Sequence, residues 1–351
     1  MKPLNKKLYK TIIIAAVNGI FILLLWLPLI QLKFSIFPQT DNLEKREFAK
    51  KPTIDELSWG SINDYFADLQ SYYNDNIGFR NQLIKLYSGI KIILLHVSPV
   101  DKVIIGKNGW LYYSNPLDGS TISDFSGKDP FSIDELKKIN DNNKLRAEWF
   151  SSRGIKLIIV IPPNKQSVYS EYLPSYYQKS GITRLDQIIN NNTSNLEILD
   201  LRQTLIDNKK TNLTYYKTDT HWNKYGAFLG YQKIIESLNL KDNYINLKTA
   251  QFAQQKLNRP GDLSIFISAP YIFEDYEVVP KNNTIIKKNQ DKLIVFHDSF
   301  GNNLNPYLEA TFKNSIFVQS PQPDYDLIEK VNPKYVIWEN VERYSNNLLN
   351  F

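Results

Sequence analysis

A serine near the end of the chain stands where a nucleophile would be presented. Residues 292–304 read KLIVFHDSFGNNL, so an apolar run that predicts a buried strand leads into Ser299 and then towards a helix. At the carboxyl end of such a strand the hydroxyl of Ser299 would face the crevice where active sites form. Its N–H, near a helix N-terminus, could help hold an oxyanion. The same DSFG sequence also suits a simple helix N-cap, so the motif alone leaves both interpretations open.

A serine nucleophile needs a base, and His221 is the best placed of the chain's three histidines. In residues 217–226 (KTDTHWNKYG), Asp219 and His221 are separated by one residue, so in an extended segment both side chains point the same way. The carboxylate would fix the imidazole tautomer and stabilise the imidazolium. Trp222 and Tyr225 could wall the same site. The segment also fits a capped helix start, and the two interpretations are compatible.

The other two histidines are weaker candidates. His96 lies in the apolar run IILLHVSPV, which favours a structural role, and His297 could face Ser299 only through an unusual turn. One histidine with scattered aspartates gives no zinc-type ligand spacing. The chain has no cysteine, which excludes a thiol nucleophile, a thiolate metal site and disulfides. We therefore expect neither a metal nor another cofactor.

Residues 11–30 (TIIIAAVNGIFILLLWLPLI) form an uncharged apolar segment about long enough to cross a bilayer. Four lysines precede it, at positions 2, 6, 7 and 10, and predict a cytoplasmic N-terminus. The segment is longer than a signal-peptide core and no small-x-small site follows it. We therefore expect an uncleaved, single-pass anchor in the cytoplasmic membrane, with the catalytic domain periplasmic or extracellular.

Despite a net charge of +6, no nucleic-acid-binding motif is visible, so nucleic acid is not an expected partner.

Three parts are expected along the chain. Residues 1–33 hold the N-terminus and the anchor, residues 34–140 a linker and a membrane-proximal helical region, and residues 141–351 the catalytic domain. In the membrane-proximal part we expect a polar linker at 41–52, helical structure over 54–97, a hairpin over 103–113 and a helix over 130–152 capped by Ser132.

In the expected catalytic part, short β-branched apolar runs alternate with helical stretches. This pattern predicts an α/β fold with a mostly parallel sheet flanked by helices. The expected strands are residues 156–161, 196–199, 293–296, 315–318 and 335–338. The expected helices between them are residues 184–190, 201–208, 224–237, 306–312 and 324–331. Residues 241–290 are less regular and are interpreted as an insertion or a lid.

Several segments together resemble a known family. DTHW (219–222) is followed about eighty residues later by HDSFG (297–301), and GKNGWLYY (106–113), VIPPNKQSVYSEYLP (160–174) and ENVER (339–343) accompany them. The combination resembles the alginate O-acetyltransferase family of the AlgJ/AlgX type, which is SGNH-hydrolase-like and has the D-alanylation protein DltD as a distant relative. Position 297 is His where a GDSL-like block has Gly. The D-x-H motif precedes the serine, an order that matches the alginate branch but not ordinary SGNH hydrolases.

The resemblance implies an O-acyltransferase, with acetyl as the expected group, that modifies an exported polysaccharide or cell-wall glycan through an acyl-serine. Its implied triad is Ser299, His221 and Asp219, and its implied partner is a membrane-bound O-acyltransferase that supplies acyl groups. A glycan acetyl-esterase and a non-catalytic glycan-binding scaffold subunit of an export machine remain alternatives. Further candidates for oxyanion or substrate contacts are Asn164, Asn302, Arg343, Trp222 and Tyr225. For Arg343, a salt bridge with Glu339 is the competing interpretation.

Overall fold

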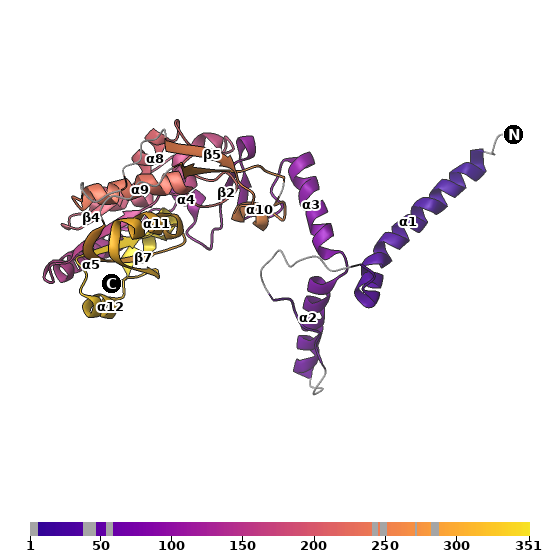
Figure 1. Ribbon diagram of the computed structural model, residues 1–351. Helices are drawn as coiled ribbons and strands as arrows, with labels where there is room; N and C mark the ends of the chain where they lie inside the picture. The colour runs from indigo at the N-terminus through magenta and orange to yellow at the C-terminus, as the bar shows by residue number, and fades with distance from the viewer. Residues whose placement is uncertain are drawn as a thin grey trace. The chain divides into compact units, whose positions relative to one another are not determined.

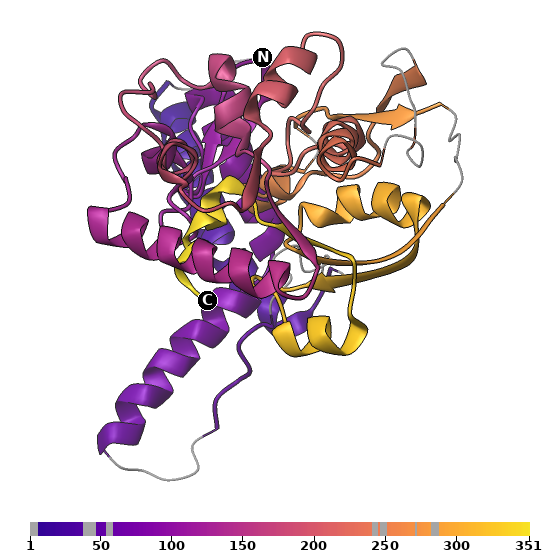
Figure 2. The same ribbon diagram turned by 90° about the vertical axis from the view of Figure 1, so that its left-hand side faces the viewer.

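The computed structural model describes residues 6–37, 47–53, 59–240, 245, 251–270, 272–281 and 288–351 (Figures 1 and 2). The chain divides into two compact units, Met1–Leu95 and His96–Phe351. The boundary predicted at residues 140/141 falls inside a helix of the second unit, Ile133–Ser151. The predicted linker at 41–52 is described only from residue 47, where it has no regular secondary structure.

The first unit consists of three helices, α1 (Lys6–Phe34), α2 (Trp59–Asn76) and α3 (Arg80–Leu95). Among the described residues, α1 is the helix that is long and apolar enough to cross a membrane, over Tyr9–Phe34. It fits a single-pass anchor. The helical region predicted at 54–97 begins outside the described residues and is broken between α2 and α3, where Phe79 adopts a positive φ of 62°.

The second unit is built on a five-stranded sheet of order β4-β3-β9-β7-β8, in which every neighbouring pair is parallel. This confirms the predicted fold class. The strands are β3 (Lys156–Ile161), β4 (Glu197–Asp200), β7 (Asn289–His297), β8 (Phe312–Gln319) and β9 (Tyr335–Glu339). All five lie where the apolar runs predict them, and β7 and β8 extend further towards their N-termini than the apolar runs do.

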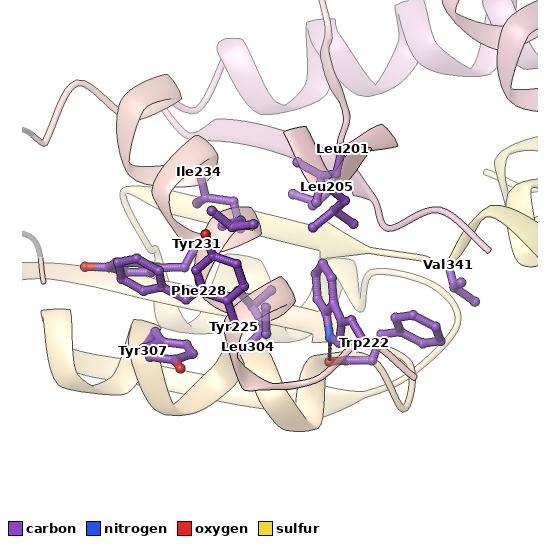
Figure 3. Packing of buried hydrophobic residues seen from close by; sticks show 14 of the residues in the cluster. Leu201, Leu205, Trp222, Tyr225, Phe228, Tyr231, Ile234, Leu304, Tyr307 and Val341 are labelled. Carbon is purple, nitrogen blue, oxygen red and sulfur yellow. Dashed lines mark hydrogen bonds between the residues drawn. The ribbon is translucent and has the colours of Figure 1, made fainter. Parts of the chain in front are cut away.

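Helices cover both faces of this sheet, because successive strand side chains point to opposite sides. On β3, for example, Ile158 packs with one apolar cluster and Ile159 with the other. The first cluster, shown in Figure 3, contains α8 (Arg202–Asn208), α9 (Lys224–Ser237) and α11 (Gly301–Thr311). The second contains α5 (Ile133–Ser151), α7 (Arg184–Asn191) and α12 (Tyr325–Val331).

Smaller elements complete the second unit. The predicted hairpin forms from β1 (Val103–Ile105) and β2 (Leu111–Tyr113), and Ser132 caps α5 in a reciprocal pair with Glu135. Two short helices, α4 (Thr121–Phe125) and α6 (Lys165–Val168), follow the hairpin and β3 respectively. Within the stretch interpreted as an insertion or lid, the described residues form β5 (Phe252–Lys256), α10 (Asp262–Phe266) and β6 (Tyr276–Pro280), with β5 and β6 antiparallel.

Candidate active site

Ser299 lies in the turn between β7 and α11, at the carboxyl end of the sheet. The carboxylate of Asp298 fixes this turn: Oδ1 accepts the N–H of Phe300 at 2.7 Å, and Oδ2 accepts the N–H of Val341 at 2.8 Å. At Gly301 an added Cβ would lie 2.4 Å from the His297 ring, so only glycine fits there. The nucleophile candidate therefore sits on a turn tied to the chain that follows β9.

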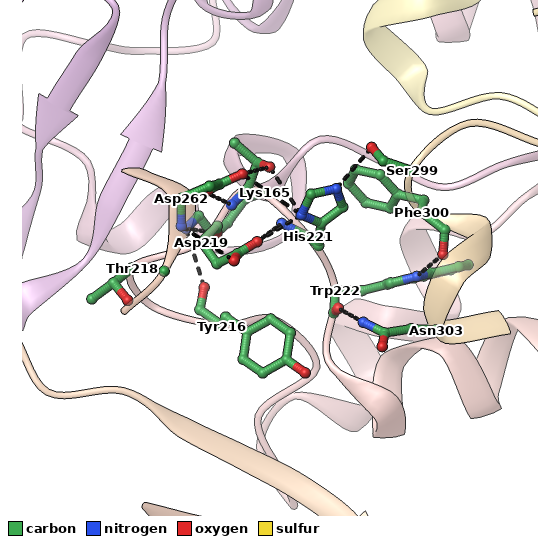
Figure 4. Close-up of polar contacts among 12 residues, drawn as sticks. Lys165, Tyr216, Thr218, Asp219, His221, Trp222, Asp262, Ser299, Phe300 and Asn303 are labelled. Carbon is green, nitrogen blue, oxygen red and sulfur yellow. Dashed lines mark hydrogen bonds and ion pairs between the residues drawn. The ribbon is translucent and has the colours of Figure 1, made fainter. Parts of the chain in front are cut away.

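The structure brings Ser299, His221 and Asp219 together in one hydrogen-bonded chain (Figure 4). His221 Nε2 lies 2.8 Å from Ser299 Oγ, and His221 Nδ1 lies 2.6 Å from Asp219 Oδ1. The imidazole is partly exposed, whereas the Asp219 side chain is only 6% exposed. A substrate could therefore reach the hydroxyl and the imidazole while the carboxylate behind them stays out of water.

Asp219 is held in its ionised form. Burial alone would raise its pKa, but the hydrogen bonds and charge of His221 outweigh burial, and Arg259 adds to them. Arg259 Nη1 lies 3.4 Å from Asp219 Oδ2, which also accepts the N–H of Asp262 at 3.3 Å. The pKa of Asp219 consequently lies below its ordinary value, as suits a group that stabilises an imidazolium.

A buried lysine supports the segment that carries this pair, residues 216–222, here called the His loop. Lys165 Nζ donates to the carbonyl oxygens of Tyr216, Lys217 and Asp219 at 3.1, 3.0 and 2.7 Å. Burial lowers the pKa of Lys165 to about 8, although Asp275, Asp262 and Asp219 favour its charged form. Sequence reasoning missed this role, although Lys165 lies in the PPNK segment that contributes to the family resemblance.

Two aspartates from the stretch interpreted as an insertion or lid hold the other side of the His loop. Asp275 accepts the N–H groups of Lys217 and Thr218 at 2.9 and 2.7 Å, and also the Thr218 hydroxyl at 2.7 Å. At Gly261 an added Cβ would lie 2.3 Å from the Thr218 carbonyl oxygen, which shows how closely this stretch approaches the loop. The stretch therefore fixes the backbone of the His loop at Lys217 and Thr218, just before Asp219.

The second of these aspartates, Asp262, approaches the imidazole itself. Its Oδ1 accepts the N–H of Thr220 at 2.7 Å, its Oδ2 accepts the Thr220 hydroxyl at 2.6 Å, and Oδ2 lies 3.7 Å from His221 Nδ1. Thr220 Oγ1 is itself 3.2 Å from Nδ1. Burial, and then the charge of Asp219, raise the pKa of Asp262. No residue pattern in the sequence pointed to this second carboxylate.

Ligand atoms of Asp219, His221 and Asp262 lie within 4.8 Å of one another, a spacing that a metal ion could bridge. Each of the two carboxylates already accepts hydrogen bonds from N–H or O–H donors on both of its oxygens. This donor set suits hydrogen bonding to the imidazole better than coordination, so we assign no metal to the group.

The aromatic candidates from the sequence have structural contacts. Trp222 is fully buried, and its Nε1–H donates to the carbonyl of Phe300 at 2.9 Å, which ties the His loop to the serine turn (Figure 4). Tyr225 lies in the apolar core against Phe252, with its hydroxyl 3.3 Å from Asn208 Oδ1. Trp222 thus adjoins the site through Phe300, whereas the contacts of Tyr225 are those of a core residue.

The polar candidates are distributed differently. Asn164 is buried and its N–H donates to Glu342 Oε2 at 2.7 Å, while Asn302 is exposed in the first turn of α11. Arg343 is buried, with its guanidinium 5.4 Å from the ring of Phe300, beside Ser299. Among the described contacts it forms no ion pair with Glu339.

Arg343 belongs to residues 339–345, here called the β9 loop, which is rich in buried polar atoms that lack a hydrogen-bond partner within the described structure. These atoms are Glu339 Oε1, Asn340 Nδ2, Glu342 Oε1, Arg343 Nε and Ser345 Oγ. Burial, and then Asp298, raise the pKa of Glu339 well above its ordinary value. Burial, and then Asp124, raise that of Glu342 to about 7. The loop therefore keeps unused hydrogen-bonding capacity next to the serine turn.

His297 does not face Ser299. Its Nδ1 lies 2.7 Å from the Asp298 carbonyl oxygen, so Nδ1 carries the proton, and its Nε2 lies 2.9 Å from Asn305 Nδ2. Both ring nitrogens thus have partners, one in the serine turn and one in α11. His96 is exposed at the end of α3, where it adopts a positive φ of 53°.

A parallel sheet covered by helices on both faces, with the candidate site at its carboxyl edge, is an open α/β fold. The family described as the SGNH hydrolase-like domain of the acetyltransferase AlgX matches residues 103–303. This is more than half of the chain, which therefore belongs to that family. The chain is 22% identical over 227 residues to "Probable alginate O-acetylase AlgJ" of Pseudomonas syringae pv. tomato, covering 63% of this chain and 55% of that protein.

The corresponding protein of Pseudomonas aeruginosa is 22% identical over 233 residues, covering 60% of this chain and 52% of its own length. The chain thus spans about half the length of the curated relatives it matches. Bacillus cereus PatB1 has a similar fold, with a TM-score of 0.51 and 17% identity over 71% of this chain and 99% of that chain. A DHHW family protein from Eubacterium siraeum gives a TM-score of 0.50, with 15% identity over 71% of this chain and 98% of that chain.

Proposed function

We propose that the protein is a serine-dependent O-acetyltransferase that transfers acetyl groups to the hydroxyls of an exported polysaccharide or cell-wall glycan. The observation that carries this proposal is the hydrogen-bonded chain from Ser299 Oγ through His221 to Asp219. The family and the names of the relatives support the acetyl group and the polysaccharide acceptor. In this proposal residues 141–351 carry the chemistry, and residues 34–140 connect it to the anchor.

The reaction has two steps. In the first, His221 Nε2 takes the proton of Ser299 Oγ as the oxygen attacks the acyl carbonyl, and the imidazolium then protonates the leaving group of the donor. In the second, His221 takes the proton of a sugar hydroxyl as that hydroxyl attacks the acyl-serine, and the proton returns to Ser299 Oγ. Asp219 stabilises the imidazolium in both steps.

The oxyanion formed in each step needs donors. The N–H of Ser299 has no acceptor within the described residues and adjoins the reacting oxygen. Arg343 is the candidate for a second donor, because its guanidinium lies against Phe300 and its Nε has no partner in the described structure. Asn164 and Asn302 are the remaining candidates for contacts to the oxyanion or the acceptor.

The acyl donor is proposed to be a membrane-bound O-acyltransferase partner. A domain outside the membrane cannot reach cytoplasmic acetyl-CoA, and a single span such as α1 cannot form a conduit for it. With the N-terminus inside, an uncleaved α1 would keep Ser299 near such a partner and raise the effective concentration of the donor.

The direct test is to trap the acyl-enzyme. The full protein is incubated with an activated acetyl ester, and the reaction is quenched. The protein is then digested, and the mass of the peptide containing Ser299 is measured by mass spectrometry. The proposal expects one added acetyl group on Ser299, its absence in Ser299→Ala, and its removal when an oligosaccharide acceptor is added. Unmodified Ser299 during turnover would contradict the acyl-serine.

The acceptor products separate the two enzymatic alternatives. Acetylated oligosaccharide as the main product indicates a transferase, whereas free acetate at the same rate with and without acceptor indicates an esterase. Deleting the gene of the membrane partner tests the supply: glycan acetylation should disappear, while the purified protein still cleaves the activated ester. Undiminished acetylation would refute the dependence on a partner.

A further inference from the structure

Helix α3 of the first unit carries a continuous stripe of apolar side chains that the site does not explain. The α3 stripe consists of Leu83, Leu86, Tyr87, Ile90, Ile93 and Leu94, and each side chain is between 45% and 70% exposed. Their spacing of three and four residues places them along one face of the helix. Single exposed apolar residues are ordinary, but a contiguous stripe of six predicts an apolar neighbour.

The charges on α3 are of one sign. Arg80, Lys85 and Lys91 lie within Arg80–Leu95, and that sequence contains no aspartate or glutamate. Lys91 Nζ lies 4.9 Å from the centre of the Tyr87 ring, so at least one of these cations borders the α3 stripe. A helix with one apolar face and only basic charges is typical of segments that lie in the headgroup region of an anionic membrane.

The start of α3 is fastened to the end of the membrane-spanning candidate. The N–H of Gly78 donates to the carbonyl of Pro28 at 3.2 Å, and an added Cβ at Gly78 would lie 2.4 Å from Gln31 Cβ. The rings of Phe37 and Phe79 are 5.6 Å apart. Because a spanning helix such as Tyr9–Phe34 ends at the membrane–water boundary, these contacts hold the first turn of α3 close to that depth.

We propose that the α3 stripe lies in the interface of the bilayer that α1 crosses, with Lys85 and Lys91 near anionic lipid headgroups. The protein would then be attached to the membrane by two elements, the spanning helix α1 and the interfacial helix α3. Pairing with a second copy of α3 explains the observations less well, because it would bring helices that carry only positive charges face to face. The proposal does not depend on the proposed catalytic function.

The protein has no cysteine, so single spin labels can be placed without removing any native residue. Leu86→Cys, Ile90→Cys and Leu94→Cys probe the α3 stripe, and Gln70→Cys, an exposed polar position on α2, is the matched control. Full-length labelled protein is reconstituted into vesicles of phosphatidylcholine and phosphatidylglycerol. Collisions with oxygen, which concentrates in lipid, are compared with collisions with a water-soluble nickel complex.

At the stripe positions we expect oxygen collisions to exceed nickel collisions several-fold, and the reverse at Gln70. Lys85→Glu combined with Lys91→Glu should reduce the lipid exposure at Ile90 in the anionic vesicles and leave it unchanged in pure phosphatidylcholine. Water-like exposure at all three stripe positions would overturn the proposal. Dipolar broadening between labels on separate copies would overturn it too, because it would identify the stripe as a contact between copies.

Discussion

The His loop and the β9 loop both border Ser299, but they use their polar groups in opposite ways. In the His loop, Lys165 engages three carbonyl oxygens, and Asp275 and Asp262 engage the N–H groups of three residues. In the β9 loop, five buried side chains each keep a polar atom without a partner in the described structure. The His loop is therefore held by internal hydrogen bonds, whereas the β9 loop has side-chain donors and acceptors that no described residue uses.

This difference separates two tasks that acyl transfer requires. A general base works best when its position and its ion-pair partner are fixed before the substrate arrives, and a saturated loop achieves that. Groups that bind an oxyanion or a sugar hydroxyl must be free until the substrate arrives. We therefore expect changes in the His loop to act on kcat, and changes in the β9 loop to act on substrate binding and on the pH dependence of stability.

The largest loss should come from the two residues of the His loop that belong to the proposed triad. His221→Ala and Asp219→Ala should each lower kcat for an activated acetyl ester by about 10⁴-fold or more, and the double variant should lose little beyond the worse single one. His297→Ala is the control and should keep far more activity, because both ring nitrogens of His297 contact Asp298 and Asn305 and neither contacts Ser299. Additive losses would mean that His221 and Asp219 do not act as a unit.

Removing the lysine behind the loop should have the next largest effect. Lys165→Met leaves the Tyr216 and Asp219 carbonyls without their donor, and the Lys217 carbonyl keeps only the N–H of Leu111. We expect a fall in kcat of about 10²-fold and a loss of about 2–4 kcal/mol in stability. Urea unfolding and steady-state kinetics measure both. A variant with normal kcat and reduced stability would show that Lys165 holds the fold but not the geometry of the base.

Arg343→Gln tests the β9 loop directly. The side chain keeps a hydrogen-bond donor but loses the charge beside Phe300, so we expect a drop of about tenfold or more in kcat/KM with little change in melting temperature. Steady-state kinetics with esters of increasing acyl size provide the measurement. An unchanged kcat/KM would remove Arg343 from the candidates for the oxyanion site.

Asp262→Asn should weaken the base less than loss of Asp219 does. The amide can still bond Thr220, but the imidazolium loses a negative charge 3.7 Å from Nδ1. We expect kcat to fall by about tenfold and the acidic limb of the kcat/KM profile to move to lower pH. A uniform loss of activity with an unmoved profile would assign Asp262 a purely structural role.

The smallest effect should be a change in how stability depends on pH. The pKa of Glu342 is raised to about 7, so between the unfolded value, about 4.3, and pH 7 the folded state binds more protons than the unfolded state. Its contribution is complete below that unfolded value and is lost as pH rises towards 7. Glu342→Gln should therefore flatten the fall in unfolding free energy between pH 5 and 7, by about 1–3 kcal/mol. Parallel curves for the two proteins would contradict this assignment.

The sequence predicted the strands and most of the helices, because these depend on local periodicity. Apolar runs located all five strands of the sheet. Asp219 and His221 do pair, but residues 217–221 form bends and not the expected extended segment, and Asp219 Oδ1 accepts the backbone N–H of His221 as well as contacting Nδ1. What it could not predict are contacts set by the tertiary fold, such as Asp262 with Thr220, 42 residues apart, or Asp275 with Thr218, 57 apart. Tyr225 was expected at the site because it is near His221 in sequence, but its position on α9 turns it into the core.

The close contact of Gly261 with the Thr218 backbone has a consequence for engineering and for divergence within the family. The stretch from β5 to β6 meets the His loop at many points. Gly261 packs on Thr218, Asp262 and Asp275 accept N–H groups of the loop, and Arg259, Leu263 and Glu277 add further hydrogen bonds to it. We expect changes at these contacts to disturb His221 more than changes at positions of the stretch that do not touch the His loop. Grafting the corresponding stretch from a relative should therefore succeed only when the graft reproduces these contacts. Activity measurements on such chimaeras would show whether the stretch influences the acceptor preference of the proposed reaction.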